Sequence, residues 1–325
     1  MANPIPSAVH IDVPLTNLAI GIFQDPANFL GTVFPLAPVD KQSNKYWVWD
    51  RGDVLRDNLQ VRQPGTESAG TEFNVSSSSY YCDVFALHMD LDDQTAANAD
   101  FDVEARIVRT LTANLQQHIE QQQIAQLLAS GKWGTDQTGT NSLSPGANQY
   151  TQFDFTGADP GLIIDQLNDT ILADTGRRGN TLVLGTTAWT KLKRSAAIKD
   201  QMKYTTAAVP TEAVVASVLG VDRVIVARGI KATSAKGQTL TTGMTFGAKT
   251  GWLGYVEPNA SMETASSAFI PVWTGLDGAS FGAAAPNIYR IEIPEKRVVR
   301  YELQIAYDMV ITSTLLGKFL ASAVA

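Results

Sequence analysis

One segment of this 325-residue sequence matches a catalytic motif: Gly278-Ala279-Ser280-Phe281-Gly282 fits the G-x-S-x-G pattern of a serine nucleophile. Such a serine needs a buried strand before it, and in that chain order an acid and then a histidine after it. Residues 273–277 do not predict a buried strand, and no histidine follows His118. We therefore interpret the segment as a Gly/Ala-rich loop. A cytoplasmic hydrolase that uses Ser280 or an acidic pair is the remote alternative.

The other side chains that could do chemistry are scattered. Zn²⁺ needs about four ligands gathered tightly, whereas the three histidines, at His10, His88 and His118, have no ligand spacing. The single cysteine, Cys82, excludes an internal disulfide and is expected to be a buried thiol. No glycine-rich phosphate or dinucleotide motif occurs. We predict no catalytic residue, no metal and no cofactor, and therefore no enzyme.

The composition is that of a globular protein long enough for one large domain or two interleaved ones, with 44% hydrophobic and 18% charged residues. No apolar run approaches the ~20 residues that span a bilayer, and the first ten residues lack a secretory signal. We therefore expect a cytoplasmic protein that does not associate with a membrane. The net charge of −7 argues against a general nucleic-acid binder. A wall that only encloses DNA remains compatible with this charge.

Residues 1–40 form an apolar arm in our prediction. Six prolines prevent a long helix, yet a disordered tail would be polar. The arm instead contains many aliphatic and aromatic residues, among them Phe23, Phe29 and Phe34. It should therefore lie on its own body or on a neighbour.

Residues 45–91 predict a long two-armed β-hairpin. The first arm contains Tyr46-Trp47-Val48-Trp49, and the return arm alternates with a period of two as far as Leu91. Gln63-Pro64-Gly65 is the expected turn. A free two-stranded ribbon is marginal in water, so this hairpin needs a partner surface.

The remaining elements predict an α+β body. A long helix at about 100–129 begins at the cap Asp100 and stops at Gly131. Residues 130–158 form a connection of little periodicity, and an antiparallel hairpin at 289–309 has one apolar face. A mixed region between them gives helices at 159–176, 188–194 and 211–220 and strands at 181–184, 223–227 and, twice, within 245–256.

This order of elements resembles the major capsid proteins of tailed phages, which have the HK-97 fold. Short sequence segments are similar too: residues 180–185 followed by 189–192, then 219–226, 254–256 and 307–325. The matching order of elements and segments extends over nearly the whole chain. The resemblance implies an N-arm (1–40), an E-loop (41–91), a peripheral domain (92–174 with 286–325) and an axial domain (175–285). The long helix is then the spine helix.

The implied function is self-assembly into the icosahedral head that encloses double-stranded DNA. The implied partners are copies of the chain in pentamers and hexamers, a portal protein, a scaffolding protein and in some relatives a decoration protein. The chain would be made in the host bacterial cytoplasm and end in the virion. An encapsulin-like nanocompartment shell, which encloses cargo enzymes, is the alternative on the same fold.

Two departures from relatives refine this expectation. The arm begins almost at Met1, so we expect a separate scaffolding protein. No lysine lies between Asp50 and Asp90, whereas some relatives crosslink an E-loop lysine to a neighbour, so we predict non-covalent assembly. The candidate assembly contacts are three arm residues and five E-loop residues: Phe23, Phe29, Phe34, Arg51, Arg56, Asp57, Arg62 and Glu67.

Overall fold

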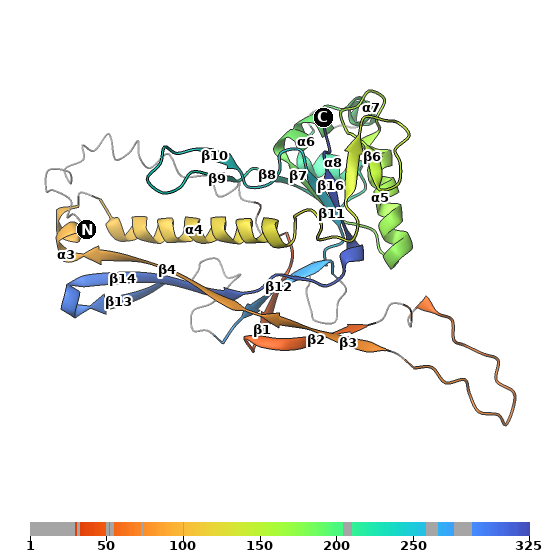
Figure 1. Ribbon diagram of the computed structural model, residues 1–325, viewed down its shortest axis with the longest axis horizontal. Helices are drawn as coiled ribbons and strands as arrows, with labels where there is room; N and C mark the ends of the chain where they lie inside the picture. The colour runs from red at the N-terminus through yellow and green to blue at the C-terminus, as the bar shows by residue number, and fades with distance from the viewer. Residues whose placement is uncertain are drawn as a thin grey trace.

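The fold was analysed in a computed structural model of the chain. The residues that it describes are 30, 33–49, 52, 55–72, 74–99, 101–203, 210–257, 266–275 and 288–325. The predictions made for Phe23, Phe29, Arg51 and Ser280 lie outside them. The architecture is α+β, with an elongated limb, a compact body at one end of it and a ribbon that extends away from both (Figure 1).

The limb is a long helix lying on three antiparallel strands of a six-stranded sheet. The helix is α4 (Val103–Gln126), and the strands are β4 (Asp83–Asp92), β13 (Ile288–Ile293) and β14 (Val298–Tyr307). β14 lies in the middle and pairs with both neighbours. Ile107 and Leu111 of α4 pack on Tyr301 and Leu303 of β14. This confirms the predicted final hairpin, whose turn is the short helix η3 (Pro294–Lys296). The prediction that both strands share one apolar face is wrong, because Ile291 of β13 lies opposite Arg300 and so on the other face from Tyr301 and Leu303.

The predicted E-loop hairpin is correct in its first half and wrong in its second. β2 (Ser43–Trp49) pairs with β3 (Val75–Tyr81) over seven residues. After Cys82 the chain changes partner, because β4 pairs with β14 along ten residues. A period of two predicts a strand but not its partner, and here Leu91 of β4 is buried with Ile107 and Leu111 of α4.

The long helix is confirmed, but its ends differ from the prediction. The cap is Asp102, whose Oδ1 accepts the Ala105 N–H at 3.0 Å, and not Asp100. Two aspartates that are two residues apart are equally suited to capping. At the other end Leu127 closes the helix, and the Trp133 indole donates to the Leu127 carbonyl at 2.5 Å. The helix therefore stops before Gly131.

The body is a six-stranded sheet covered on one face by four helices. The strand order is β6-β5-β16-β11-β7-β8. The strands are β6 (Gln149–Thr151), β5 (Gln137–Thr140), β16 (Gly317–Ala321), β11 (Gly251–Gly254), β7 (Thr181–Gly185) and β8 (Arg223–Ala227). The helices are α5 (Pro160–Thr175), α6 (Thr186–Leu192), α7 (Ala196–Met202) and α8 (Glu212–Val218).

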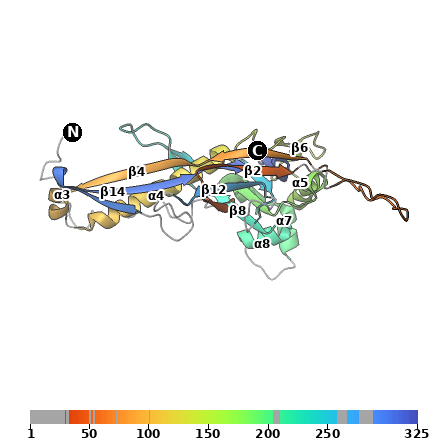
Figure 2. The same cartoon turned by 90° about the horizontal axis from the view of Figure 1, so that it is seen from below.

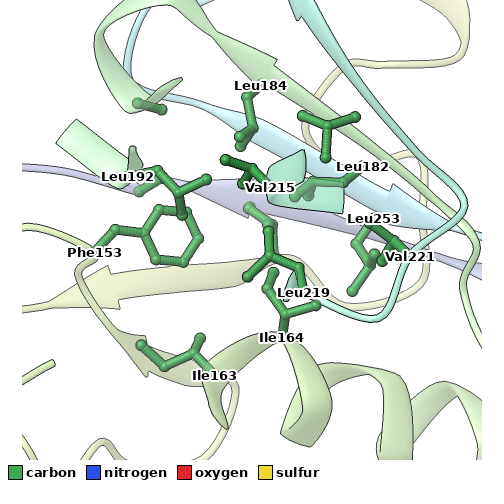
Figure 3. Packing of buried hydrophobic residues seen from close by; sticks show 14 of the residues in the cluster. Phe153, Ile163, Ile164, Leu182, Leu184, Leu192, Val215, Leu219, Val221 and Leu253 are labelled. Carbon is green, nitrogen blue, oxygen red and sulfur yellow. The ribbon is translucent and has the colours of Figure 1, made fainter. Parts of the chain in front are cut away.

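The core of the body lies between these helices and the sheet. Leu182 and Leu184 of β7 and Leu253 of β11 pack against Ile164 and Val215 of the helices (Figure 3). Residues of opposite parity on the same strands, such as Val183 and Trp252, face a second core shared with the limb. Both faces of this sheet are thus buried.

Several predicted element ends in the body are confirmed. Asp159 caps α5 with Pro160 at its first position, and Gly176 ends it in the left-handed conformation with φ 71°. Thr211 caps α8, and β8 has the predicted bounds.

Other predictions for this region are wrong. Residues 130–158 are not without regular structure, because they contain β5 and β6. Only one strand, β11, lies within 245–256, and its upstream neighbour is a short hairpin of β9 (Ile230–Ala232) and β10 (Thr242–Met244). Because β16 pairs with β11 and β5, residues 317–321 lie in the sheet of the body and not with the limb.

A buried strand that the sequence did not reveal joins the arm to the limb. β12 (Ala268–Trp273) pairs in parallel with β1 (Leu36–Val39) and in antiparallel with β14 and with β15 (Val310–Ile311). All of its residues but Trp273 are buried. The continuous apolar run of Ala268–Val272 fits a strand covered on both faces, which lacks the alternation used to find strands. This strand also belongs with the limb sheet, not with the region 175–285.

The last elements are small. α3 (Asp93–Asn98) precedes α4, and η4 (Thr314–Leu316) precedes β16. Among the described residues, no helix is long and apolar enough to cross a lipid bilayer.

Candidate assembly surface

The ribbon of β2 and β3 packs on the rest of the subunit at its root and is exposed at its tip. Its two strands form a sheet of their own, and within the described residues no third strand pairs with either. Both views show it leaving the limb and ending in a long loop away from the body (Figures 1 and 2). Two strands alone are marginally stable, so the ribbon depends on its root and on what covers its tip.

The root of the ribbon is held by an aromatic cluster. Tyr46 lies edge-on to Phe269 of β12 with ring centroids 5.6 Å apart, and Tyr80 and Cys82 are buried beside them. The Tyr81 N–H donates to Asp308 Oδ2 at 3.0 Å. Burial raises the pKa of the Cys82 thiol to about 11, so this cysteine is protonated and structural at neutral pH.

The tip of the ribbon, residues 55–72, is exposed throughout. We call it the tip loop. The predicted turn is confirmed, because the Thr66 N–H donates to the Gln63 carbonyl at 3.2 Å and Gly65 has φ 81°, as in a type II turn with proline second. Asn58 Nδ2 donates to Thr71 Oγ1 at 3.0 Å across the loop.

Three apolar side chains in the tip loop face solvent almost completely. Leu55, Leu59 and Val61 are 66%, 93% and 97% exposed. Full burial of one such side chain is worth about 1.5–3 kcal/mol. The loop therefore gains most by lying on an apolar surface that its own subunit does not supply.

The charged residues predicted as assembly contacts are exposed on the same loop, but two of them stabilise the loop itself. Asp57 Oδ1 accepts the Leu59 N–H at 3.0 Å, and Arg62 Nε donates to the Thr66 carbonyl at 2.6 Å. Arg56 and Glu67 are exposed. Contacts of these four residues with another copy remain a prediction. The apolar residues were missed, although three aliphatic side chains in a polar loop are a visible signal.

The prediction for Phe34 is wrong. Phe34 is 1% exposed and packs inside its own subunit, stacked on Trp133 at 6.2 Å and edge-on to Trp252 at 5.1 Å. The sequence left open whether the arm covers its own body or a neighbour, and at Phe34 it covers its own body. A buried aromatic inside the subunit cannot form a contact between subunits.

An apolar strip on β4 offers a surface of the kind that the tip loop needs. Leu87 and Met89, 44% and 37% exposed, lie opposite Leu303 and Tyr301 of β14, which α4 buries. The helix covers the middle strand but only part of the edge strand. On the opposite face of this sheet, Arg300 binds Asp90 through two hydrogen bonds of 2.8 and 3.0 Å and lowers the pKa of that carboxyl.

Among the described residues, the groups with catalytic potential do not gather into one site. In the part of the chain that the structure describes, no three His, Cys, Asp or Glu residues lie close enough to hold a metal ion. His118 packs between Phe85 and Tyr307, and His88 is exposed on β4. The serine of the G-x-S-x-G segment lies outside the described residues. The exposed apolar side chains of the tip loop and of β4 are therefore the candidate surface.

Comparison with known proteins supports the same conclusion. No protein-family model matches the chain. The major capsid protein of Burkholderia phage BcepMu is 24% identical over 223 residues, which are 68% of this chain and 70% of that protein.

Solved structures share the whole architecture. A phage-related protein from Bordetella bronchiseptica RB50 has a TM-score of 0.66 and 19% identity, with 96% of this chain and 97% of that one covered. A chain from the capsid of cyanophage P-SCSP1u has a TM-score of 0.56 and 11% identity, with 98% and 99% covered. The SrpI encapsulin of Synechococcus elongatus PCC 7942 has a TM-score of 0.54 and 13% identity, with 97% of each chain covered. The fold is the HK-97-like capsid fold, as predicted.

Proposed function

We propose that this protein is the major capsid protein of a tailed bacteriophage, a structural protein whose copies assemble into the icosahedral shell around the phage double-stranded DNA. The curated relative is itself a phage major capsid protein, and the fold is that of phage capsids. The observation that carries the mechanism is the exposed apolar tip loop at the end of a two-stranded ribbon whose root is held by the subunit's own core.

In this proposal the tip loop of one copy lies on a neighbour, and the β4 strip around Leu87 and Met89 is the receiving surface. Ring assembly uses such heterologous contacts, in which a loop meets a different surface on the next copy. The charges of Arg56 and Glu67 would then fix the register of the contact, while Leu55, Leu59 and Val61 supply its apolar area. Pentamers and hexamers built in this way make up the shell.

The domain assignment follows with the corrections that the strand pairing requires. Residues 1–40 form the N-arm, and the E-loop extends from 41 to 82. The peripheral domain contains β4, α4, β12 and the final hairpin, with α4 as the spine helix. The axial domain contains the six-stranded sheet, including β16, and would surround the five- or sixfold centre.

Further partners belong to the same proposal. A portal protein at one vertex and a separate scaffolding protein complete the head, with a decoration protein on some shells. The chain is assembled in the host bacterial cytoplasm and remains in the virion. The net charge of −7 suits a wall that encloses DNA without binding it specifically.

The experiment that tests this function combines a deletion with two substitutions. Deletion of residues 55–72 should leave a folded, soluble subunit that forms no closed shells in negative-stain micrographs. Substitution of Leu59 and Val61 by serine should raise the concentration needed for assembly by at least about tenfold, because a loss of about 1.4 kcal/mol per contact corresponds to a factor of ten.

Leu143 provides the matched control. It is 62% exposed in a loop before β6, away from the ribbon, so Leu143→Ser should assemble like the unmodified chain. Normal shells from the deletion variant would refute the mechanism. Absence of particles from the unmodified chain under all assembly conditions, with hydrolytic activity in the monomer, would favour the hydrolase.

An encapsulin-like shell is the second candidate, favoured by the likeness to the SrpI encapsulin. The two functions differ in what the particle encloses. Particles purified after infection or co-expression with a packaging system should contain nuclease-protected double-stranded DNA. Particles that contain a protein cargo and no protected DNA would indicate the nanocompartment.

A further inference from the structure

A buried carboxylate joins three segments that are far apart in the sequence. Glu120, on the inner face of α4, is 2% exposed. Its Oε2 accepts the N–H of Leu30, the first described residue of the arm, at 3.3 Å. Its Oε1 accepts the hydroxyl of Thr245, which follows strand β10. One side chain therefore connects the arm, the long helix and the base of the β9–β10 hairpin.

The hairpin base is shaped around this carboxylate. The Thr245 N–H donates to the carbonyl of Gly229, which precedes β9, at 2.9 Å, and the Thr245 hydroxyl oxygen lies 3.0 Å from the same carbonyl. A Cβ at Gly229 would overlap the carboxylate oxygen Oε1 of Glu120. Residue 229 must be glycine because the Glu120 carboxylate occupies the space that a side chain would fill. The carboxylate and the hairpin base are therefore closely packed.

No described cation pairs with Glu120, although charged groups are present on the segments around it. Arg228, next to Gly229, is bound to Glu212 at 2.5 Å. Arg223 donates to the Val33 carbonyl at 2.5 Å and to Thr181 at 3.0 Å. On α4 itself, His118 packs on Phe85 and Tyr307, toward the limb sheet. Glu120 is thus held by two uncharged donors.

We propose that Glu120 is a protonation-sensitive tie, which holds the root of the arm and the base of the β9–β10 hairpin against α4 when protonated and loosens when ionised. An ionised carboxylate that is buried without a cation is unfavourable, and water that enters on opening relieves it. A protonated carboxyl still has an oxygen to accept the Leu30 N–H and carries no charge to solvate. This tie concerns the subunit's own fold and does not depend on the proposed shell.

The direction of the pH effect follows from the same geometry. Burial raises the pKa of Glu120, and the hydrogen bonds from Thr245 and Leu30 oppose part of that rise. A carboxyl with a raised pKa in the folded chain stabilises the fold fully below its ordinary value of 4.5, and this stabilisation is lost as the pH rises through the folded value. The arm root is therefore held most firmly in acid.

Amide hydrogen exchange of the full-length chain, corrected for the intrinsic effect of pH, measures the opening. Protection of the Leu30 region and of the Gly229–Thr245 region should fall together as pH rises, by at most about tenfold per pH unit, the limit for one proton. Glu120→Gln, which cannot ionise, should remove this dependence. Glu104→Gln, at the exposed start of the same helix, should keep it.

A second variant keeps the test decisive if Glu120→Gln does not fold. Thr245→Val removes a donor that favours the ionised form, so the pKa of Glu120 in the folded chain should rise further. The midpoint of the loosening should therefore move to higher pH than in the unmodified chain. A flat profile in the unmodified chain, an unchanged slope in Glu120→Gln, or an unmoved midpoint in Thr245→Val would each overturn the proposal.

Discussion

At the scale of single residues, burial separates side chains that shape the subunit from those left for neighbours. Phe34 and Leu59 are both large, apolar and located outside helices and strands, yet one is 1% and the other 93% exposed. The sequence assigned an assembly role to Phe34 and overlooked Leu59. The difference arises from two tryptophans, Trp133 and Trp252, that are distant in the sequence and enclose Phe34.

Substitutions of Phe34 and Leu59 should affect different properties, the first stability and the second assembly. Phe34→Ala should lower the free energy of unfolding of the subunit by about 3–5 kcal/mol, because it leaves a cavity between two fixed rings. Leu59→Ala should leave that free energy nearly unchanged and weaken assembly instead. Denaturant unfolding of the unassembled subunit, followed by sedimentation of assembly reactions, measures both. Equal destabilisation by the two substitutions would contradict the model of the tip loop.

His118 gives a prediction about pH. Its Nε2 is buried without a hydrogen-bond partner, and burial lowers its pKa below the ordinary value of 6.5. The neutral form is therefore favoured in the folded chain, and stability falls as the pH drops below about 6.5 toward the folded value. The loss of unfolding free energy from about pH 7.5 to about pH 5.5 should be smaller in His118→Leu than in the unmodified chain.

His88 is the control for that measurement, because it is exposed on β4. His88→Gln should lose as much stability over the same pH range as the unmodified chain. If both variants behave alike, the acid sensitivity comes from groups other than His118.

At the scale of elements, the ribbon and the last strand have opposite relations to the fold. The ribbon pairs only with itself, whereas β16 lies between β5 and β11 inside a sheet, with Leu320 fully buried. Removal of residues 317–325 should therefore prevent folding, while removal of residues 55–72 should not. Soluble yield and circular dichroism of the two truncated chains distinguish these outcomes. A folded protein without β16 would show that the sheet does not need its inner strand.

The sequence predicted elements well where local chemistry marks their ends. Asp159-Pro160 and Gly176 bound α5, and the alternation of β14 marks its buried face. It failed where pairing depends on distant residues. β4 looked like the return arm of the ribbon, β16 looked like a terminal apolar tail, and β12, buried on both faces, had no period to detect.

The candidate surface was predicted in outline and not in detail. An unsupported ribbon is visible in sequence as two β-prone arms around a polar turn, and the turn at Gln63–Thr66 is confirmed. The roles of its residues depend on which side chains find partners within the loop. Asp57 and Arg62 do, and only the folded loop reveals this.

At the scale of the whole molecule, assembly without covalent bonds is the property to test. The stretch from Asp50 to Asp90 has no lysine to crosslink, and the one cysteine is buried. Purified particles boiled in detergent under non-reducing conditions should therefore give a single band near 35.0 kDa. A ladder of larger bands would reveal a crosslink, and mass spectrometry of those bands would locate it.

The place of β16 also has a consequence for how the protein is made. β16 together with Val324, 1% exposed, completes the core of the body. The strands on either side of β16, β5 and β11, are synthesised earlier and are not joined through it until residues 317–321 have been made. A nascent chain therefore contains both strands of the ribbon long before it contains every strand of the body.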